Sequence, residues 1–449
     1  MIDSRLIEKY NVACPRYTSY PTVPYWTEAP AENSWFQLLE KKIEGTEKPK
    51  MSLYIHLPFC ESLCTYCGCN TRITVNHAVE LPYIDALLKE WEMYKPYLEK
   101  VEIEELHLGG GTPTFFSATN LTKLLNGILS TIKKSKSFSF SFEAHPANTT
   151  FGHLYQLKEL GFDRLSLGIQ DFNLTVQKAI NRVQTFEEVK SVVDQARSLG
   201  FKSINFDIIY GLPFQTLEAV EDTIEKVKKL MPERIAFYSY AHVPWKHKAQ
   251  RRYSEEDLPD NDYKRSLYEL GREKLEEAGY LVIGMDHFAL PEDDLAKSYL
   301  SKKMHRNFMG YTPNRSDVLI GLGVSSISDI GLAMMQNSKV VESYKEQIIE
   351  GKLPVENGHV LNDADLIVRE HVLELMCHLE TDIPDNFPIN QTDIKSHLQE
   401  MINDGLVHLE DNKLLVNEKG APFVRNAALG IDERYWSASP KKNTFSKSV

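Results

Sequence analysis

Short apolar runs alternate with amphipathic stretches along most of the chain from residue 51 onward. Seven runs rich in β-branched and aromatic residues are typical of strands, because such side chains fit a pleated, half-buried surface. Between the runs, apolar residues recur at the spacing of a helix that buries one face. The runs are SLYIHLPF, ELHLGGG, SFSFEAH, RLSLGIQ, SINFDIIYG, RIAFYSYA and LVIGMDHFAL, and the predicted helices cover 77–95, 120–133, 186–199, 215–230 and 261–278.

Repeated strand–helix–strand units predict parallel pairing through right-handed crossovers. We therefore expect an α/β fold, with a partial or complete parallel (β/α) barrel over residues 51–335. Residues that carry chemistry follow the predicted strands directly, and in a barrel such positions share the carboxyl-terminal face where active sites form. One such residue could merely begin a loop, but six together favour an active face. They are Cys60, Gly109–Gly111, Glu143, Gln170, Asp207 and His242.

The segments that flank this region have a different pattern. Residues 1–50 carry Pro15, Pro21, Pro24 and Pro30 with several aromatic residues, which predicts an extended arm over the barrel mouth with one short helix near 34–42. Residues 336–435 predict a small, mainly helical domain: Asn362 can cap a helix, another helix lies near 393–403, and a hairpin joins 406–409 to 414–416. The polar segment 436–449 predicts a disordered tail.

Composition narrows the possible functions. Of 449 residues, 42% are apolar and 25% are charged, an ordinary mixture for a globular protein. The net charge of −12 argues against a nucleic-acid partner held by a broad basic face, although a local basic pocket remains compatible with it. The chain has neither a signal core nor a membrane-length apolar run, so we expect a cytoplasmic protein with no membrane partner.

Four of the six cysteines lie within one short stretch. Cys60, Cys64 and Cys67 have the spacing C-x3-C-x2-C, and Cys69 follows two residues later. A disulfide framework would spread its cysteines, and structural zinc typically needs two separated pairs. Three thiolates in one loop can hold three corners of a [4Fe–4S] cluster and leave one iron open for an external ligand.

The cysteine spacing after the first strand, with Gly109-Gly110-Gly111-Thr112 after the second, resembles the radical S-adenosylmethionine (SAM) superfamily. A glycine triplet alone is a weak signal, but its N–H groups can bind a carboxylate. The resemblance implies that SAM chelates the open iron and that the reduced cluster cleaves SAM to a 5′-deoxyadenosyl radical. The cluster then supplies the chemistry and the protein supplies orientation.

Further stretches resemble the oxygen-independent coproporphyrinogen III dehydrogenases (oxidases), and this resemblance covers nearly the whole chain. It implies an oxidoreductase of porphyrin and haem biosynthesis that converts two propionates of coproporphyrinogen III to vinyl groups, giving protoporphyrinogen IX. It also implies a monomer, a flavodoxin- or ferredoxin-type electron donor and an unidentified electron acceptor. The matching stretches are PRYTSYPT from Pro15, LYIH from Leu53, DFN from Asp171, NRVQ from Asn181, IIYGLP from Ile208, MDHFA from Met285 and HRNF from His305.

Residue roles follow from the same resemblance, which implies two SAM molecules in one site. Cys69 would act in catalysis without ligating iron; the alternative is a buried thiol of no special role. Asp207 could instead cap a strand, and Arg182 could form a surface ion pair. The SAM on the cluster would contact Tyr54, Gly110, Glu143 and Ile327, and the second SAM would contact Tyr66, Gly111, Thr112, Gln170, Arg182, Asp207 and Ala241.

The sequence motifs do not identify the substrate-binding residues as closely as they identify the SAM-binding residues. His56 and His107 lie inside predicted strands and are expected to be core residues. Three histidines near loop starts could contact substrate, and four arginines are candidate partners for propionates. These residues are His242, His287 and His305, and Arg16, Arg251, Arg252 and Arg306.

Two other functions are compatible with the motifs. A haem-binding chaperone would share the barrel and cluster, but such a relative lacks the fourth cysteine and the long arm, and both are present here. A radical SAM methyltransferase that opens haem is the third possibility. The products of an anaerobic assay separate all three.

Overall fold

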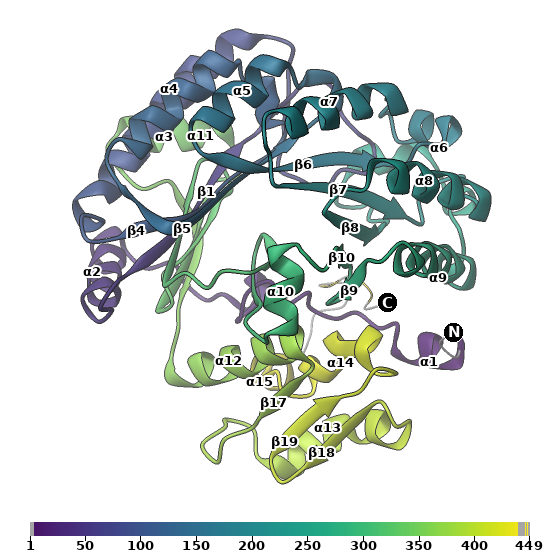
Figure 1. Cartoon of the computed structure of the whole chain (residues 1–449). Helices are drawn as coiled ribbons and strands as arrows, with labels where there is room; N and C mark the ends of the chain where they lie inside the picture. Colours follow the sequence, from purple (N-terminus) through teal and green to yellow (C-terminus); the bar gives the residue numbers. More distant parts are fainter. Residues whose placement is uncertain (1–3, 439–444, 446, 448–449) are drawn as a thin grey trace.

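A curved twelve-stranded sheet dominates the computed structural model, which describes residues 4–438, 445 and 447 (Figure 1). Its centre consists of seven parallel strands in the order β13-β1-β4-β5-β6-β7-β8. The sheet forms an open arc, so the predicted barrel is confirmed in its partial form. The parallel strands are β1 (Lys50–Leu57), β4 (Glu102–Gly110), β5 (Lys133–Ala144), β6 (Phe162–Gln170), β7 (Ser203–Tyr210), β8 (Arg234–Ser239) and β13 (Val318–Leu322).

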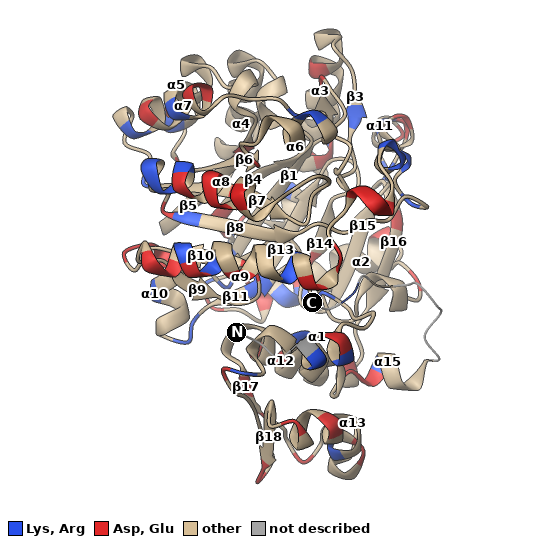
Figure 2. Ribbon diagram, turned by 90° about the vertical axis from the view of Figure 1, so that its right-hand side faces the viewer, with Lys and Arg blue, Asp and Glu red and all other residues tan. Residues whose placement is uncertain are grey.

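Helices cover the convex side of the arc (Figure 1), and several of them carry both acidic and basic residues (Figure 2). Five of them confirm the predicted helices to within a few residues at each end. The other two, α5 and α6, are only nine and six residues long, too short to show a clear helical period in the sequence. The helices are α3 (Glu80–Tyr94), α4 (Ala118–Leu129), α5 (Phe151–Glu159), α6 (Leu174–Ala179), α7 (Phe186–Ser198), α8 (Leu217–Leu230) and α9 (Asn261–Glu277).

The parallel strands have one apolar face and one polar face. Phe140 and Phe142 on β5, like Leu165 and Leu167 on β6, are buried in the main core. Successive side chains of a strand point to opposite faces, so the alternate positions point into the arc. Those positions carry serines, carboxylates and amides, which gives the concave face a polar lining.

Both ends of the sheet change to antiparallel pairing. The run LVIGMDHFAL, predicted as one more parallel strand, is a hairpin of β9 (Leu281–Ile283) and β10 (His287–Ala289) that pairs with β8. Only three residues join these strands, far fewer than a parallel crossover needs. The other elements of these regions are β11 (His305–Asn307), β12 (Gly310–Thr312), β14 (Ile327–Asp329), β15 (Ala333–Asn337), β16 (Val355–Val360), α10 (Asp294–Leu300) and α11 (Val341–Ile349).

The sheet extends beyond the boundary expected at residue 335. That position lies inside β15, and β16 continues the same sheet. Tyr344 and Ile348 of α11 are buried in the main core, so this segment packs with the barrel. The chain leaves the barrel only after Val360, where Asn362 caps the next helix as predicted.

A second core lies in the C-terminal part, where the predicted helix and hairpin are confirmed. The expected arm does not lie only over the barrel. Its helix α1 (Ser4–Tyr10) and Tyr17 pack into this second core, whereas α2 (Glu32–Glu44), the predicted short helix, packs into the main core. The C-terminal elements are α12 (Asp363–His378), β17 (Glu380–Asp382), α13 (Gln391–Asn403), β18 (Val407–Glu410), β19 (Lys413–Val416), α14 (Val424–Leu429) and α15 (Glu433–Ser437).

Most of the predicted tail 436–449 lies outside the described residues. Within the described part of the chain, none of the helices combines the length and apolar character needed to cross a bilayer.

Candidate functional site

The four clustered cysteines lie on and next to a loop between two short strands, β2 (Phe59–Cys60) and β3 (Arg72–Ile73), which pair with each other. The backbone N–H of Thr74 donates to the carbonyl of Cys60 at 2.9 Å and closes this loop at its base. The Thr65 N–H donates to the Ile180 carbonyl at 3.0 Å, and Asn181 Nδ2 donates to the Leu63 carbonyl at 2.8 Å. These bonds fix the loop against the segment that follows α6.

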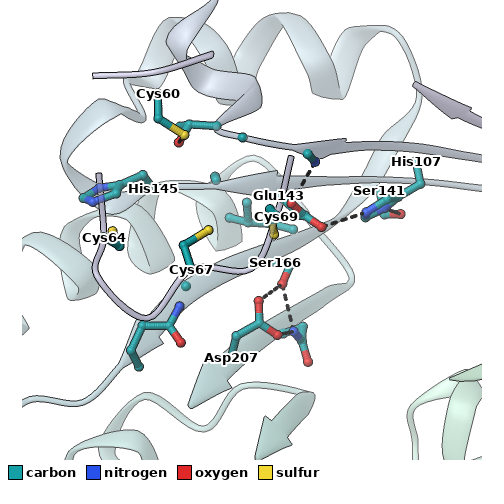
Figure 3. A pocket seen from close by; sticks show the side chains of 18 of the residues that line it. Cys60, Cys64, Cys67, Cys69, His107, Ser141, Glu143, His145, Ser166 and Asp207 are labelled. Atoms are coloured by element: carbon teal, nitrogen blue, oxygen red, sulfur yellow. Dashed lines mark hydrogen bonds and ion pairs between the residues drawn. The ribbon is translucent and has the colours of Figure 1, made fainter. Parts of the chain in front are cut away.

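All four thiols line one cavity of about 830 Å³ on the concave side of the sheet (Figure 3). None of them is in a disulfide; Cys60, Cys64 and Cys67 are half-buried, whereas Cys69 is exposed. A hydrogen bond with Cys69 lowers the pKa of Cys67 to about 7, whereas burial raises the pKa of Cys60 to about 11. Three free thiols on a fixed loop are a donor set that fits a cubane cluster with one iron left open.

Arg182 lies beside these thiols. Its Nη2 donates to the Gly168 carbonyl at 2.7 Å, and its Nη1 lies 3.8 Å from Cys64 Sγ. The guanidinium is therefore held by the end of β6 with its positive charge next to the cysteines. Such a charge favours thiolates and an anionic cluster.

The glycines after β4 form a close-packed shelf next to the loop. A Cβ on Gly110, whose φ is +115°, would lie 2.8 Å from the His56 ring, and one on Gly111 would lie 2.6 Å from the Pro58 carbonyl oxygen. Only glycine fits at these two positions. The shelf therefore brings backbone, rather than side chains, to the cavity next to the cysteines.

One polar network lies on β4 and β5, facing Cys69 (Figure 3). The Gly110 N–H donates to Glu143 Oε2 at 3.3 Å, and His107 Nε2 lies 3.4 Å from Glu143 Oε1. His107 Nδ1 and Ser141 Oγ are 2.8 Å apart. The Glu143 carboxylate is thus held at the cavity edge.

A second network lies on β6 and β7. Ser166 Oγ donates to Asp207 Oδ2 at 3.0 Å, and Asn205 Nδ2 donates to Asp207 Oδ1 at 2.9 Å. Burial, and then the negative charge of Glu143, raise the pKa of Asp207 to about 6. His145 lies across the cavity, where burial and then the charge of Arg182 lower its pKa to about 3. At neutral pH the carboxylate is charged and this imidazole is neutral.

The structure brings most of the predicted site residues to this one cavity. Gln170 ends β6 with a φ of +65°, in the left-handed region. Such strained backbone conformations are common at functional sites. The predicted residues that line the cavity are Cys60, Cys64, Tyr66, Cys67, Cys69, Gly110, Gly111, Thr112, Glu143, Gln170, Arg182 and Asp207.

Three predicted residues do not line it. Tyr54 lies behind it, where its hydroxyl and His56 Nδ1 are 3.0 Å apart and its ring stacks on His107. Ile327 packs against a separate apolar cluster around Trp26. Ala241 lines a neighbouring cavity, and so does His242, which was grouped with the strand-end residues. The loop after β8 runs out of the sheet here and carries both residues away from the arc.

The sequence analysis did not predict the polar residues of β5, β6 and β7 that line the cavity. Ser166 and Asn205 hold the Asp207 carboxylate and Ser141 holds His107, yet each has the appearance of an ordinary strand residue in the sequence. A signal was present, because serine, asparagine and acidic residues alternate with phenylalanine, leucine and isoleucine in these strands. His107, expected to be a satisfied core residue, lies at the cavity edge and binds Glu143.

Comparisons with known proteins agree with this geometry. Residues 54–227 match the model of the radical SAM superfamily. The chain is 36% identical to the oxygen-independent coproporphyrinogen III oxidase of Pseudomonas aeruginosa, over 100% of this chain and 98% of the relative. The corresponding Helicobacter pylori oxidase is 38% identical over 96% of both chains. A solved structure of coproporphyrinogen III oxidase from Escherichia coli, described as a radical SAM enzyme, superposes with a TM-score of 0.90 at 34% identity and covers 96% of this chain and 99% of its own.

The partial parallel barrel and its three-cysteine loop therefore define a radical SAM enzyme, with a [4Fe–4S] cluster and SAM as the cofactors of its class. Within that class, the chain belongs to the oxygen-independent coproporphyrinogen III oxidase family.

Proposed function

We propose that this protein catalyses the oxygen-independent oxidative decarboxylation of coproporphyrinogen III to protoporphyrinogen IX. Two propionate side chains become vinyl groups, and each loses one hydrogen atom, one electron and carbon dioxide. The observation that carries the proposal is full-length similarity to oxidases of this name, combined with three free thiols that line one cavity.

When bound, a reduced cluster with SAM supplies the 5′-deoxyadenosyl radical that removes the hydrogen atom. The chain holds that cluster through Cys60, Cys64 and Cys67, and Arg182 offsets its negative charge. The Gly110–Gly111 shelf brings the backbone close to the cavity beside the cysteine loop.

Two separate polar networks in this cavity support two SAM sites. In our proposal the Glu143 network, with Gly110, holds the SAM on the cluster, and Tyr54 and Ile327 support it from behind. The Asp207 network holds the second SAM, because a charged carboxylate accepts hydrogen bonds from ribose hydroxyls or an ammonium group. The other residues that we assign to the second SAM are Tyr66, Gly111, Thr112, Gln170, Arg182 and, at the edge, Ala241.

Cys69 has a separate place in the proposal. It lines the same cavity as the three ligands but is exposed. We assign it a catalytic role after cluster assembly rather than a place on the cluster. A Cys69→Ala variant should keep its full iron content and turn over more slowly.

We further propose a cytoplasmic monomer that receives electrons from a flavodoxin- or ferredoxin-type donor and passes the electron from each decarboxylation to a separate acceptor. All six cysteines are free, which is compatible with a reducing compartment.

An anaerobic assay of the reconstituted protein with coproporphyrinogen III, SAM and a reductant tests the function. We expect a divinyl product, two molecules of carbon dioxide and two of 5′-deoxyadenosine per substrate. Tight haem binding without turnover would indicate a haem chaperone instead. A methylated, opened tetrapyrrole would indicate a haem-degrading methyltransferase.

A further inference from the structure

A second cavity, of about 1460 Å³, lies next to the cysteine-lined one. Its walls come from the loop after β8, helix α9, the β9–β10 hairpin, the N-terminal arm and the C-terminal part of the chain. The side chains of β7 and β8 alternate between the two cavities: Ile209 and Tyr238 line the first, whereas Tyr210 and Ser239 line the second. The two cavities are thus neighbours across one layer of strands.

The two cavities lie side by side at the carboxyl-terminal ends of these strands. Gln250 Nε2 donates to the carbonyls of both Tyr66 and Ala241, each at 3.3 Å. Tyr66 lines the first cavity and Ala241 lines the second. The rims of the two cavities are thus joined by one buried side chain.

The second cavity is basic, although the protein is acidic. Among its described lining residues, seven are Lys or Arg and four are Asp or Glu, whereas the whole chain carries a net charge of −12. Some of these charges are already used: Arg272 Nε donates to Glu276 at 2.9 Å, and Asp286 is bound to His287 at 2.7 Å. The cations that remain include Arg16 on the arm and Lys264 on α9.

Lys264 on α9 is the best-defined of the remaining cations. Its Nζ donates to the Tyr240 carbonyl at 2.7 Å, and no described carboxylate forms an ion pair with it. Its stem crosses Gly211, where a Cβ would lie 2.6 Å from Lys264 Cε. Burial, and then the positive charges of Arg16 and Lys447, lower the pKa of Lys264 to about 8.

Arg16 reaches the same cavity from the arm. Its side chain is exposed and has no ion pair with any residue that the structure describes. Its backbone is fixed, since Arg306 Nη2 donates to the Arg16 carbonyl at 3.3 Å. Arg16 also helps to lower the pKa of Asp286 in the same cavity, but no described carboxylate forms an ion pair with Arg16 or Lys264. Two cations that repel each other and have no ion-pair partner form a site that an anion would complete.

We propose that Lys264 and Arg16 bind a propionate carboxylate of the tetrapyrrole, which rests in the second cavity while a reacting propionate reaches the first. This inference rests on the proposed function and specifies its substrate site. The ligand chemistry is that of a polycarboxylate, which suits the second cavity better than the first, where three Lys or Arg residues face four Asp or Glu residues.

The test uses the anaerobically reconstituted holoenzyme and coproporphyrin III, the stable oxidised form of the proposed substrate, titrated by its fluorescence. We expect Lys264→Met and Arg16→Gln to weaken porphyrin binding, and to raise the KM for coproporphyrinogen III, by about tenfold or more, since a lost charged hydrogen bond costs about 1.5–3 kcal/mol. Iron content and SAM affinity should not change. Binding to the wild type should weaken with added salt, and this dependence should be smaller in both variants.

Lys264→Arg keeps the charge and should retain most of the affinity. Lys274→Gln is the matched control, because Lys274 lies on the same helix, pairs with Glu221 at 2.7 Å and does not line the cavity. Unchanged porphyrin affinity in both charge-removing variants would overturn the inference. So would a loss of SAM affinity without a loss of porphyrin affinity, since the cations would then serve SAM or merely anchor Tyr240. A wild type that binds porphyrin but forms no vinyl product would contradict the proposed function alone.

Discussion

The two neighbouring cavities differ in charge, and the difference matches the two kinds of molecule that the reaction needs. The described residues that line the first cavity include three Lys or Arg and four Asp or Glu residues, together with the cysteines. Those that line the second include seven Lys or Arg and four Asp or Glu residues. SAM is a compact ligand with two positive centres and one carboxylate, so it suits the balanced cavity. A substrate with four carboxylates suits the basic one.

The charged groups of the two cavities also come from different structural elements. In the first cavity the polar groups come from strands and are bound to one another, as Asp207 is to Ser166 and Asn205. In the second, the key cations come from a helix and from the arm, and they lack carboxylate partners among the described residues. The carboxylates that we assign to SAM binding are thus placed on the rigid sheet, and recognition of a large ligand is left to elements that join different parts of the chain.

The largest expected effect is in the first cavity. Cys64→Ala removes one of three thiolate ligands, so the reconstituted variant should lose most of its iron and its visible absorbance, and turnover should be abolished. Porphyrin binding in the second cavity should persist, because none of its lining residues changes. Coproporphyrin III titration of this variant checks the separation, and a parallel loss of porphyrin affinity would mean that the cavities are not independent.

Asp207→Asn should have the next largest effect. It removes the charge but keeps the size, and the lost charged hydrogen bonds should raise the KM for SAM by about 10- to 100-fold. Because the pKa of Asp207 is about 6, the wild type should lose SAM affinity as the pH falls below 6, and the variant should show no such change. An equal pH dependence in both proteins would contradict the role of this carboxylate.

Much of this arrangement could be predicted from the sequence. The cysteine spacing, the glycines and the residues after each strand are local features, and twelve of the fifteen predicted site residues meet in one cavity. The alternation of Ser139 and Ser141 with Phe140 and Phe142 defines the two faces of β5, so the polar lining of the cavity could also be predicted from the sequence.

The second cavity could not be predicted in the same way. Lys264 is one lysine among several on an amphipathic helix, and nothing near it in the sequence shows that Arg16, almost 250 residues earlier, lies beside it. The same limit applies to the sheet boundary: β16 joins the barrel through pairing with β15, which depends on tertiary contacts rather than on local pattern. A site formed by residues far apart in the sequence can be recognised only once the tertiary structure is known.

The pH dependence of substrate binding separates the cavities again. Lys264, with a pKa of about 8, is charged at neutral pH and loses its proton above pH 8, so the KM for coproporphyrinogen III should rise by up to about tenfold between pH 8 and 9.5. The groups facing it are Arg16, Lys447 and the ring of Tyr210. In Lys264→Arg the guanidinium stays charged, so the rise should disappear. A rise of equal size in that variant would show that a group other than Lys264 loses its proton over this pH range.

The smallest expected effect sharpens the account of the first cavity. Ser166→Ala removes one hydrogen bond to Asp207 and leaves that from Asn205, so the KM for SAM should rise by about three- to fivefold, since a single hydrogen bond contributes about 0.5–1.5 kcal/mol. The pKa of Asp207 should also increase, because Ser166 stabilises the charged form, and the pH at which SAM affinity declines should move upward. Ser191→Ala on the outer surface of α7 is the control, since this exposed serine accepts a bond from Gln195 and does not line the cavity. If Ser166→Ala altered porphyrin affinity and left SAM affinity intact, the assignment of the two ligands to the two cavities would have to be reversed.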